Sequence, residues 1–258
     1  MISIWRNSYS SAGASALCSF QRSLLPPKFK NISGCRLLTL DVEHRERMAV
    51  DLQIQSTPTL KNSLQNAATL FKSNIPSAAL FVPLCHVDAK PSLLFTIRPS
   101  DLSYNSCSFP AAEHLDEEGS LISTSLRAAR TDLGVLPEQT EVLGTLREST
   151  DASGGVNITP IVSYIGNVHV ASLRPSVHSE VMQTFSVPID ELLSDRCLRW
   201  MQLPNKNVMP VFLLRDGTLQ AQGLTSMILH NVLRVVAGPD PAYREILYGP
   251  FFKGQPPS

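Results

Sequence analysis

Three positions on one face of a predicted helix decide what chemistry this chain can perform. Ala128, Thr131 and Asp132 recur at i, i+3 and i+4, so they share a face if the segment before Gly134 is helical. Carboxylate oxygens gathered on one face of a helix can hold hard divalent cations, and such cations can generate a hydroxide from bound water. Only Asp132 supplies a carboxylate here, so the face is poorly equipped for that chemistry.

The segment 108–135 (SFPAAEHLDEEGSLISTSLRAARTDLGV) contains the element that carries this face. It begins with a tight loop at residues 109–112, passes through acidic residues 116–118 and then shows helical periodicity. An apolar stripe predicts the side that packs inward, formed by Ile122, Leu126, Ala129 and Leu133. Gly134 follows directly, and glycine suits a left-handed C-terminal cap. We therefore expect one helix that ends at Gly134.

This loop and helix resemble the signature of the Nudix hydrolases, in which a Gly-Gly loop leads into a helix carrying Arg-Glu, then Glu-Glu, then Gly. The Ser-Phe-Pro sequence at 108–110 narrows the resemblance to the coenzyme A diphosphatase branch. Two apolar runs, PSAALFVPLC at 76–85 and LLFTIR at 93–98, resemble the entry strands of its mitochondrial members. The resemblance covers roughly residues 75–237 and implies an α/β fold, the Nudix α/β/α sandwich with a mixed central sheet.

The other patterns along the chain predict elements in the order of that fold. Strands are expected at 77–87, 92–98, 141–148 and 156–165, with turns at 88–91 and 149–155. A short helix is expected at 188–193 and a last helix at 224–236. Between them, Asp216-Gly217 separates two apolar runs, and Asp-Gly favours a tight primed turn.

The resemblance also implies an activity, the Mg²⁺- or Mn²⁺-dependent hydrolysis of the diphosphate bridge of coenzyme A or its thioesters. Arg127 matches the family, whereas Ala128 and Thr131 stand where the family has glutamates. Two opposite unit charges about 4 Å apart attract by roughly 4 kcal/mol at an effective dielectric of about 20. At about 1.4 kcal/mol per tenfold, losing two carboxylates reduces metal affinity or rate by several orders of magnitude. We expect a Nudix fold whose standard metal site is impaired.

The resemblance assigns roles to eight residues. The expected metal ligands are Asp132 and Glu118, although Glu118 lies one position off in the family spacing. Glu180 is the expected acid/base residue or outer metal ligand, and the alternative is an exposed loop carboxylate. The other expected catalytic residue is Arg127, and the expected substrate-binding residues are Arg98, Phe109, Ala111 and Ala112. The two alanines replace paired glycines, and alanine disfavours positive φ, which puts the close backbone approach of the loop in doubt.

Two functions therefore stay open. The first is that of the family, with catalysis weak or lost, and with Mg²⁺ or Mn²⁺ as cofactor if the chain is active. The second is a catalytically silent Nudix module, a pseudoenzyme that binds a coenzyme A derivative, a nucleotide or a protein partner. In both, the expected ligand is coenzyme A or another diphosphate-bridged small molecule.

Composition excludes several other classes. The 258 residues carry 22 basic and 22 acidic side chains, so no net field favours nucleic acid. The longest apolar runs, such as 78–85, are too short to span a bilayer. The five cysteines are widely spaced and form no CxxC or Cys/His pair at zinc-ligand spacing, so we expect reduced, mostly buried thiols.

The charges are unevenly distributed along the chain. No Asp or Glu occurs from Met1 to Leu40, where arginine, lysine and many serines alternate with apolar residues. This composition is typical of a mitochondrial transit peptide, so we expect residues 1–40 to direct the chain to the mitochondrial matrix. Residues 41–74 then form a helical extension, 75–238 the Nudix domain and 239–258 an irregular tail.

Overall fold

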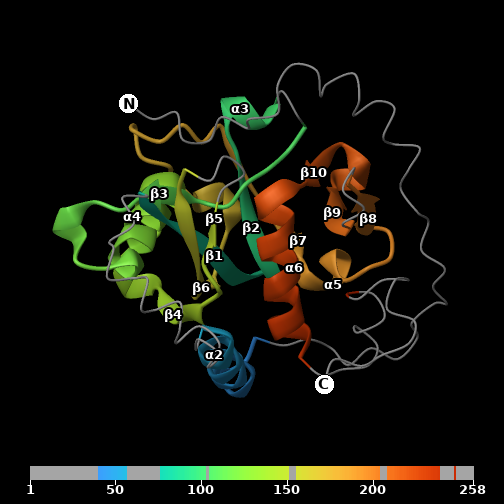
Figure 1. Cartoon of the computed structure of the whole chain (residues 1–258), viewed down its shortest axis with the longest axis horizontal. Coiled ribbons are helices and arrows are strands. Elements are labelled where there is room, and N and C mark those ends of the chain that lie inside the picture. Colours follow the sequence, from blue (N-terminus) through green and yellow to red (C-terminus); the bar gives the residue numbers. More distant parts are fainter. Residues whose placement is uncertain are drawn as a thin grey trace.

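A mixed β-sheet forms the centre of the molecule (Figure 1). The structure, a computed structural model, describes residues 40–56, 76–102, 105–150, 155–203, 208–238 and 247. The strand order is β4-β6-β1-β2-β7, with β3 paired to β1 and β5 to β6. The bounds are Ser77–Val87 (β1), Lys90–Ile97 (β2), Ala111–Glu113 (β3), Glu141–Thr145 (β4), Ser149–Thr150 (β5), Asn157–Asn167 (β6) and Gln183–Pro188 (β7). The pair β1–β6 is parallel and the other pairs are antiparallel, so the sheet is mixed as expected.

The turn between β1 and β2 explains their register. Val87 pairs with Lys90, which leaves Asp88 and Ala89 as a two-residue loop with φ of 50° and 61°. Positive φ at both central positions matches the right-handed twist of the two strands. The predicted turn at 88–91 is therefore confirmed, and it is shorter than predicted.

A second, antiparallel sheet contains β8 (Leu198–Gln202), β9 (Val208–Leu214) and β10 (Leu219–Ala221). The predicted hairpin at Asp216-Gly217 is present, but the prediction of a tight two-residue turn is wrong. Leu214 pairs with Leu219, so four residues form the loop instead of two. The sheet also contains β8, which the sequence pattern did not predict.

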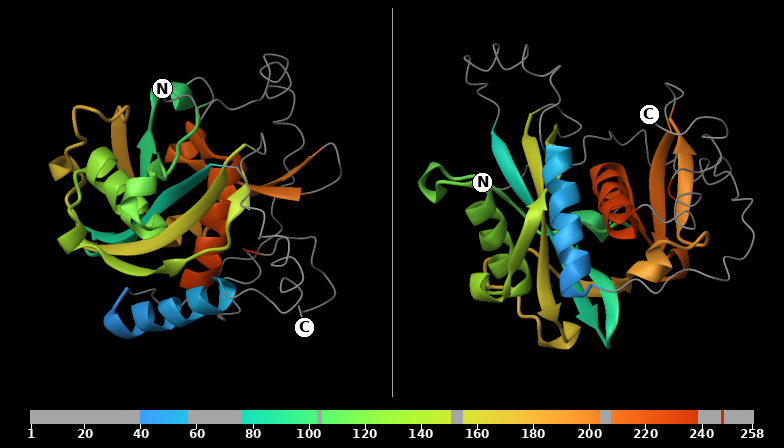
Figure 2. Two further views of the ribbon diagram at one scale, coloured as in Figure 1. Left: turned by 60° about the vertical axis from the view of Figure 1, so that its left-hand side comes forward. Right: turned by 90° about the horizontal axis from the view of Figure 1, so that it is seen from below.

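Helices cover both faces of the main sheet (Figure 2). Helix α4 (Leu121–Leu133) packs on one face, where Ala129 and Leu133 meet Phe81, Leu94 and other apolar side chains. Helix α6 (Gly223–Ala237) lies on the other face, between the main sheet and the three-stranded sheet. Its buried residues belong to the larger of two hydrophobic clusters. This arrangement confirms the expected α/β/α sandwich.

Helix α2 (Val42–Ser56) corresponds to the charged segment expected to be a helical linker. Met48 and Leu52 are fully buried, and a Cβ added at Gly144 in β4 would come within 2.8 Å of the Leu52 Cβ. Arg45 lies over the Tyr164 ring at 4.3 Å and pairs with Glu141. The helix is therefore packed tightly against the sheet.

The short elements complete the chain. They are α3 (Pro99–Leu102), α5 (Ile189–Leu192) and the 3-10 turns η4 (Asp116–Glu118), η5 (Pro137–Gln139), η6 (Val170–Ser172) and η7 (Arg215–Gly217). Cys85, Cys107 and Cys197 are free and buried, as expected, and burial raises the pKa of Cys85 to about 12. Among the helices described, none combines the length and apolar character needed to cross a bilayer. The predicted leader up to residue 39, a helix predicted at 57–72 and the tail apart from Leu247 lie outside the described residues.

Candidate functional site

The ends of helix α4 are fixed by the signals that its sequence contains. Ser120 is the N-cap, and its Oγ accepts a hydrogen bond from the Ser123 amide at 3.1 Å. Gly134 closes the helix with φ of 72°, which confirms the predicted left-handed cap. The predicted apolar stripe is confirmed for Leu126, Ala129 and Leu133, which pack against the sheet, but Ile122 is 42% exposed. The helix therefore packs on the sheet mainly through its C-terminal half.

The loop before α4 has a different backbone from a glycine loop. Ala111 and Ala112 lie in strand β3, where Ala112 pairs with Ala79 and Ala111 with Leu80 of β1. Neither alanine has a positive φ. Extended backbone suits alanine, so the sequence and the local structure agree. Paired glycines can adopt positive φ and let a loop approach a ligand closely, whereas these two alanines do not adopt that conformation. Their predicted substrate contact stays a prediction.

Arg127 and Glu118 form an ion pair at the N-terminal end of α4. The Arg127 Nε donates to one oxygen of Glu118, and its Nη2 donates to the other at 3.2 Å and to the Glu113 carbonyl at 2.5 Å. Thr124 Oγ1 and the Leu115 amide donate to the same carboxylate at 2.7 and 3.1 Å. The Arg127 hydrogen bond, the strongest of these effects, lowers the pKa of Glu118 to about 2. The predicted metal ligand Glu118 is thus committed to protein donors.

Asp132 lies at the other end of the helix in a second, more buried network. The Arg98 guanidinium donates from Nη2 to one carboxylate oxygen, and Ser179 Oγ donates to the other at 2.8 Å. Asp132 is 4% exposed and Arg98 is 9% exposed. The structure therefore brings together a predicted metal ligand and a predicted substrate-binding residue, and it pairs them with each other.

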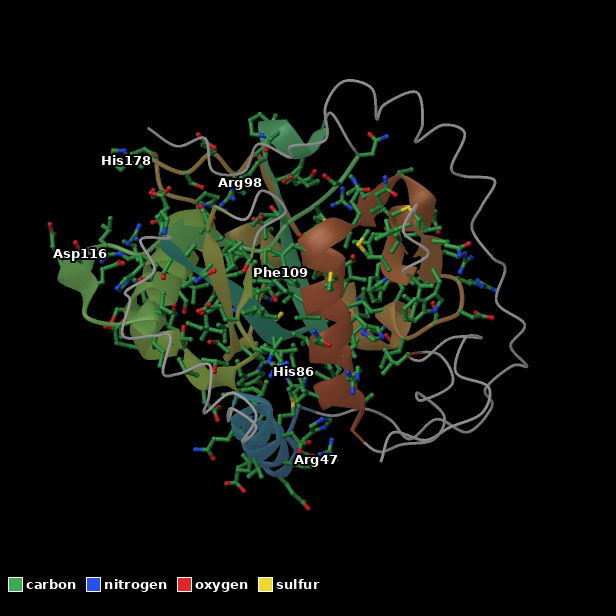
Figure 3. The ribbon with its side chains drawn as sticks, in the orientation of Figure 1. Arg47, His86, Arg98, Phe109, Asp116 and His178 are labelled. Carbon is green, nitrogen blue, oxygen red and sulfur yellow. The ribbon has the colours of Figure 1, made fainter. Side chains whose placement is uncertain are left out.

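Two predicted site residues lie apart from these networks. Phe109 is 1% exposed and stacks on Phe95, with ring centroids 5.0 Å apart. It lies among the core side chains at the centre of the molecule (Figure 3), and its predicted substrate contact stays a prediction. Glu180 is exposed in the loop before β7, and no described side chain hydrogen-bonds its carboxylate. That placement matches the alternative of an exposed loop carboxylate, although a catalytic role stays a prediction.

The two positions that lack carboxylates differ in their surroundings. Ala128 is 2% exposed, so its Cβ packs against neighbouring atoms, whereas Thr131 is half-buried. A glutamate at position 128 would therefore have to displace neighbouring side chains. The two positions that lack carboxylates on this face therefore differ in how readily a larger side chain could be placed there.

Sequence reasoning missed the hydroxyl groups that complete both networks. Thr124 Oγ1 bridges Glu118 and His114, whose Nδ1 lies 2.7 Å from it. Ser179 contacts Asp132 across 47 residues of sequence. Thr124 shares a helix face with Arg127 at i, i+3, which could have indicated its place. No sequence signal indicated Ser179, because a tertiary contact brings it to the helix.

Comparison with known proteins gives the family. The mitochondrial coenzyme A diphosphatase NUDT8 of Homo sapiens is 30% identical over 181 residues, which cover 67% of this chain and 75% of that protein. The NUDT8 protein of Mus musculus is 28% identical over 193 residues, covering 72% and 90%. Nudix hydrolase 3 of Caenorhabditis elegans is 28% identical over 190 residues, covering 67% and 78%. The chain belongs to the Nudix hydrolase family, near its coenzyme A diphosphatase branch.

No protein-family model matches the chain. Solved structures that resemble it include a MutT/nudix family protein from Enterococcus faecalis, with a TM-score of 0.41, 17% identity and 81% of each chain covered. A C. elegans Ap4A hydrolase binary complex has a TM-score of 0.38 and 12% identity, and the match covers 46% of this chain and 84% of that one. The family assignment depends on the sequence relatives.

Nudix hydrolases generally depend on divalent metal ions, so Mg²⁺ or Mn²⁺ is the cofactor to test against the site. Across the described ranges, no group of three or more His, Cys, Asp or Glu side chains is arranged to hold a metal ion. Asp132 and Glu118, the two expected ligands, each hydrogen-bond an arginine and a hydroxyl group. The residues present therefore do not fit a metal site of the family type in this arrangement.

Proposed function

We propose that this chain is a Nudix-fold protein that binds coenzyme A or another diphosphate-bridged small molecule, and that its metal-dependent hydrolysis is weak or lost. The ligand class is supported by the relatives, two of which are named mitochondrial coenzyme A diphosphatases. The loss of catalysis is supported by one observation above all. Both carboxylates expected to hold the metal are paired with arginines instead.

The energetics favour this reading. A divalent ion at this helix lacks the two glutamates replaced by Ala128 and Thr131, and it must also compete with Arg98 for Asp132. Each missing charge interaction is worth roughly 4 kcal/mol at about 4 Å and an effective dielectric of about 20. Removing one partner of a buried ion pair adds an unfavourable term of about 3–5 kcal/mol. Weak metal affinity follows from both effects.

Residual hydrolysis remains an outcome to test, because Glu180 is an exposed carboxylate next to Ser179, whose side chain is hydrogen-bonded to Asp132. An accessible carboxylate can take a proton from water if a diphosphate lies beside it. The alternative function is a silent module that binds a nucleotide or a protein partner. Both readings are separated by measuring turnover and binding independently.

The test uses coenzyme A, Mn²⁺ and three proteins: the wild type, an Ala128→Glu/Thr131→Glu variant and the matched Ala128→Gln/Thr131→Gln variant. The glutamine variant controls for the extra volume at the buried position 128. We expect little turnover by the wild type and by the glutamine variant, and at least roughly tenfold more by the glutamate variant. Wild-type turnover equal to that of the glutamate variant would contradict the loss of catalysis.

Binding is measured separately by thermal shift without metal. A ligand that binds only the folded state raises the melting temperature with its concentration. We expect coenzyme A to stabilise the wild type, whereas the same concentration of adenosine, which lacks a diphosphate, does not. A melting temperature unchanged by coenzyme A would remove this ligand from the proposal even if the glutamate and glutamine variants fail to fold.

We also propose that the chain acts in the mitochondrial matrix, with a leader within residues 1–40 that ends before the buried Leu40, 41–74 as a helical extension, 75–238 as the Nudix domain and 239–258 as the tail. The absence of acidic residues up to Leu40 and the mitochondrial names of two relatives support this. Fusing residues 1–40 to a fluorescent protein tests it. A cytosolic signal from that fusion would exclude the leader.

A further inference from the structure

The segment 173–182, which we call the strap, runs along the C-terminal half of α4 and returns to β2 (Figure 1). Three backbone hydrogen bonds fix it. The Arg174 amide donates to the Leu133 carbonyl at 3.2 Å, and the Ser176 amide donates to the Thr131 carbonyl at 2.8 Å. At its other end the Met182 amide donates to the Ile97 carbonyl at 2.8 Å. The strap therefore satisfies carbonyl groups at the end of α4 that have no partner within the helix.

Asp132 connects the strap to both neighbours at once. Its side chain accepts hydrogen bonds from Arg98, which directly follows β2, and from Ser179 in the strap. Ser179 Oγ in turn accepts a hydrogen bond from the Val181 amide at 3.1 Å. Both carboxylate oxygens are thus used, and one buried side chain joins three segments that are far apart in the sequence.

We propose that Arg98, Asp132 and Ser179 form a latch, and that they are positioning residues that hold the strap, and Glu180 with it, against α4 without a metal ion. Glu180 directly follows Ser179 and comes two residues before Met182, so the backbone on both sides of it is anchored. The latch stands independently of the proposed ligand, because it depends only on contacts within the chain.

The charges support a metal-free latch. The side chains of Arg98 and Asp132 are 11% and 6% exposed, so water screens the pair little. The guanidinium balances the carboxylate, and a divalent ion that took Asp132 would separate the buried arginine from the carboxylate it hydrogen-bonds, leaving Asp101 as a neighbouring negative charge. Breaking this buried, hydrogen-bonded pair is unfavourable, so the latch and metal binding by Asp132 compete with each other.

The test is amide hydrogen exchange of the whole chain without ligand, in the wild type, Ser179→Ala, Ser179→Thr and Ser172→Ala. Ser172 is the matched control, because its Oγ also makes a local hydrogen bond, to the His169 carbonyl at 2.7 Å, but does not contact Asp132. We expect Ser179→Ala to speed exchange of the Ser176, Val181 and Met182 amides roughly tenfold. Amides inside β6 should be unchanged, Ser179→Thr should keep the wild-type rates, and Ser172→Ala should leave the strap protected.

Unchanged exchange at Ser176 and Met182 in Ser179→Ala would overturn the latch, and so would equal loosening in Ser172→Ala. A second measurement adds Mn²⁺ to the wild type. The latch predicts the same exchange rates and melting temperature with and without the ion, whereas slower exchange of the strap with Mn²⁺ would show Asp132 free to bind metal. Neither experiment uses coenzyme A, so the latch can fail while the proposed ligand stands, and the reverse.

Discussion

Helix α4 has an arginine–carboxylate pair at each end, and the two pairs differ in how much water reaches them. At the N-terminal end, Arg127 is 39% and Glu118 13% exposed. At the C-terminal end, Arg98 and Asp132 are 11% and 6% exposed. The first pair joins residues nine apart and organises one loop, whereas the second joins residues 34 apart and ties separate elements together.

Because of this difference, the two arginine–carboxylate pairs should contribute unequally to the free energy of unfolding. An exposed pair is worth about 0–1 kcal/mol because water and salt screen it. Breaking a buried pair leaves an uncompensated charge, which costs about 3–5 kcal/mol. If α4 is held mainly from its C-terminal end, substitutions there should have larger effects than matched substitutions at the other end.

The largest effect is expected from Asp132→Ala. It leaves Arg98 buried without its partner, so the free energy of unfolding should fall by about 3–5 kcal/mol. Urea denaturation measures this. The matched change at the other end, Glu118→Ala, removes a more exposed pair and hydrogen bonds to Leu115 and Thr124, and should cost about 1–2 kcal/mol. Equal losses in the two variants would break the comparison.

The double variant Arg98→Met/Asp132→Leu tests whether the buried charge itself explains the larger effect expected at the C-terminal end of α4. Replacing both members of a buried pair with apolar residues of similar size is often nearly neutral. The double variant should therefore be more stable than Asp132→Ala alone, as measured by the same urea transitions. A double variant as unstable as the single one would mean that Asp132 acts through something other than its charge.

An intermediate effect is expected from Gly134→Ala, compared with Gly119→Ala. The two glycines flank the helix with φ of 72° and 69°, so alanine suffers the same left-handed strain of about 1 kcal/mol at each. A Cβ at Gly134 would lie 2.4 Å from the Arg174 carbonyl oxygen, whereas nothing lies within 4 Å at Gly119. Overpacking against the strap adds about 1–3 kcal/mol. Thermal or urea unfolding that shows equal losses would exclude this close contact.

The smallest effect is the pH dependence of Glu118→Gln. The Arg127 hydrogen bond lowers the folded-state pKa of Glu118 from 4.5 to about 2. A carboxylate with a lowered pKa stabilises the fold above the unfolded-state pKa, and loses this contribution as the pH falls towards the folded-state pKa. The stability difference between wild type and variant, about 1 kcal/mol because Arg127 is partly exposed, should shrink below about pH 4.5. Urea titrations between about pH 6 and pH 3 check this, and a constant difference would contradict it.

Much of the fold could be predicted because its signals are local. Long apolar runs indicated β1, β2 and β6, and Gly134 marked the end of α4. The strand β8 was missed because Leu198–Gln202 (LRWMQ) is short, lacks a regular alternation of apolar and polar residues, and depends on pairing with β9. The turn predicted from Asp216-Gly217 was too short, because the pairing register of β9 and β10, rather than the dipeptide alone, sets the length of the loop.

The candidate site was less predictable because its contacts are tertiary. Residue types alone revealed the missing carboxylates at Ala128 and Thr131. They did not reveal that Arg98 meets Asp132, or that Ser179 completes the pair. Phe109 was assigned to a substrate from the neighbouring signature, whereas its stacking on Phe95 depends on how β2 and the following loop pack.

The close fit of α2 on Gly144 limits how the N-terminal region can be processed. Leu40, Met48 and Leu52 are all at most 1% exposed, so the folded unit begins at Leu40 or earlier. A protease that cut inside α2 would remove Met48 or Leu52 from the core and expose β4 to solvent. Cleavage of the N-terminal region therefore leaves this fold intact only if it falls upstream of Leu40.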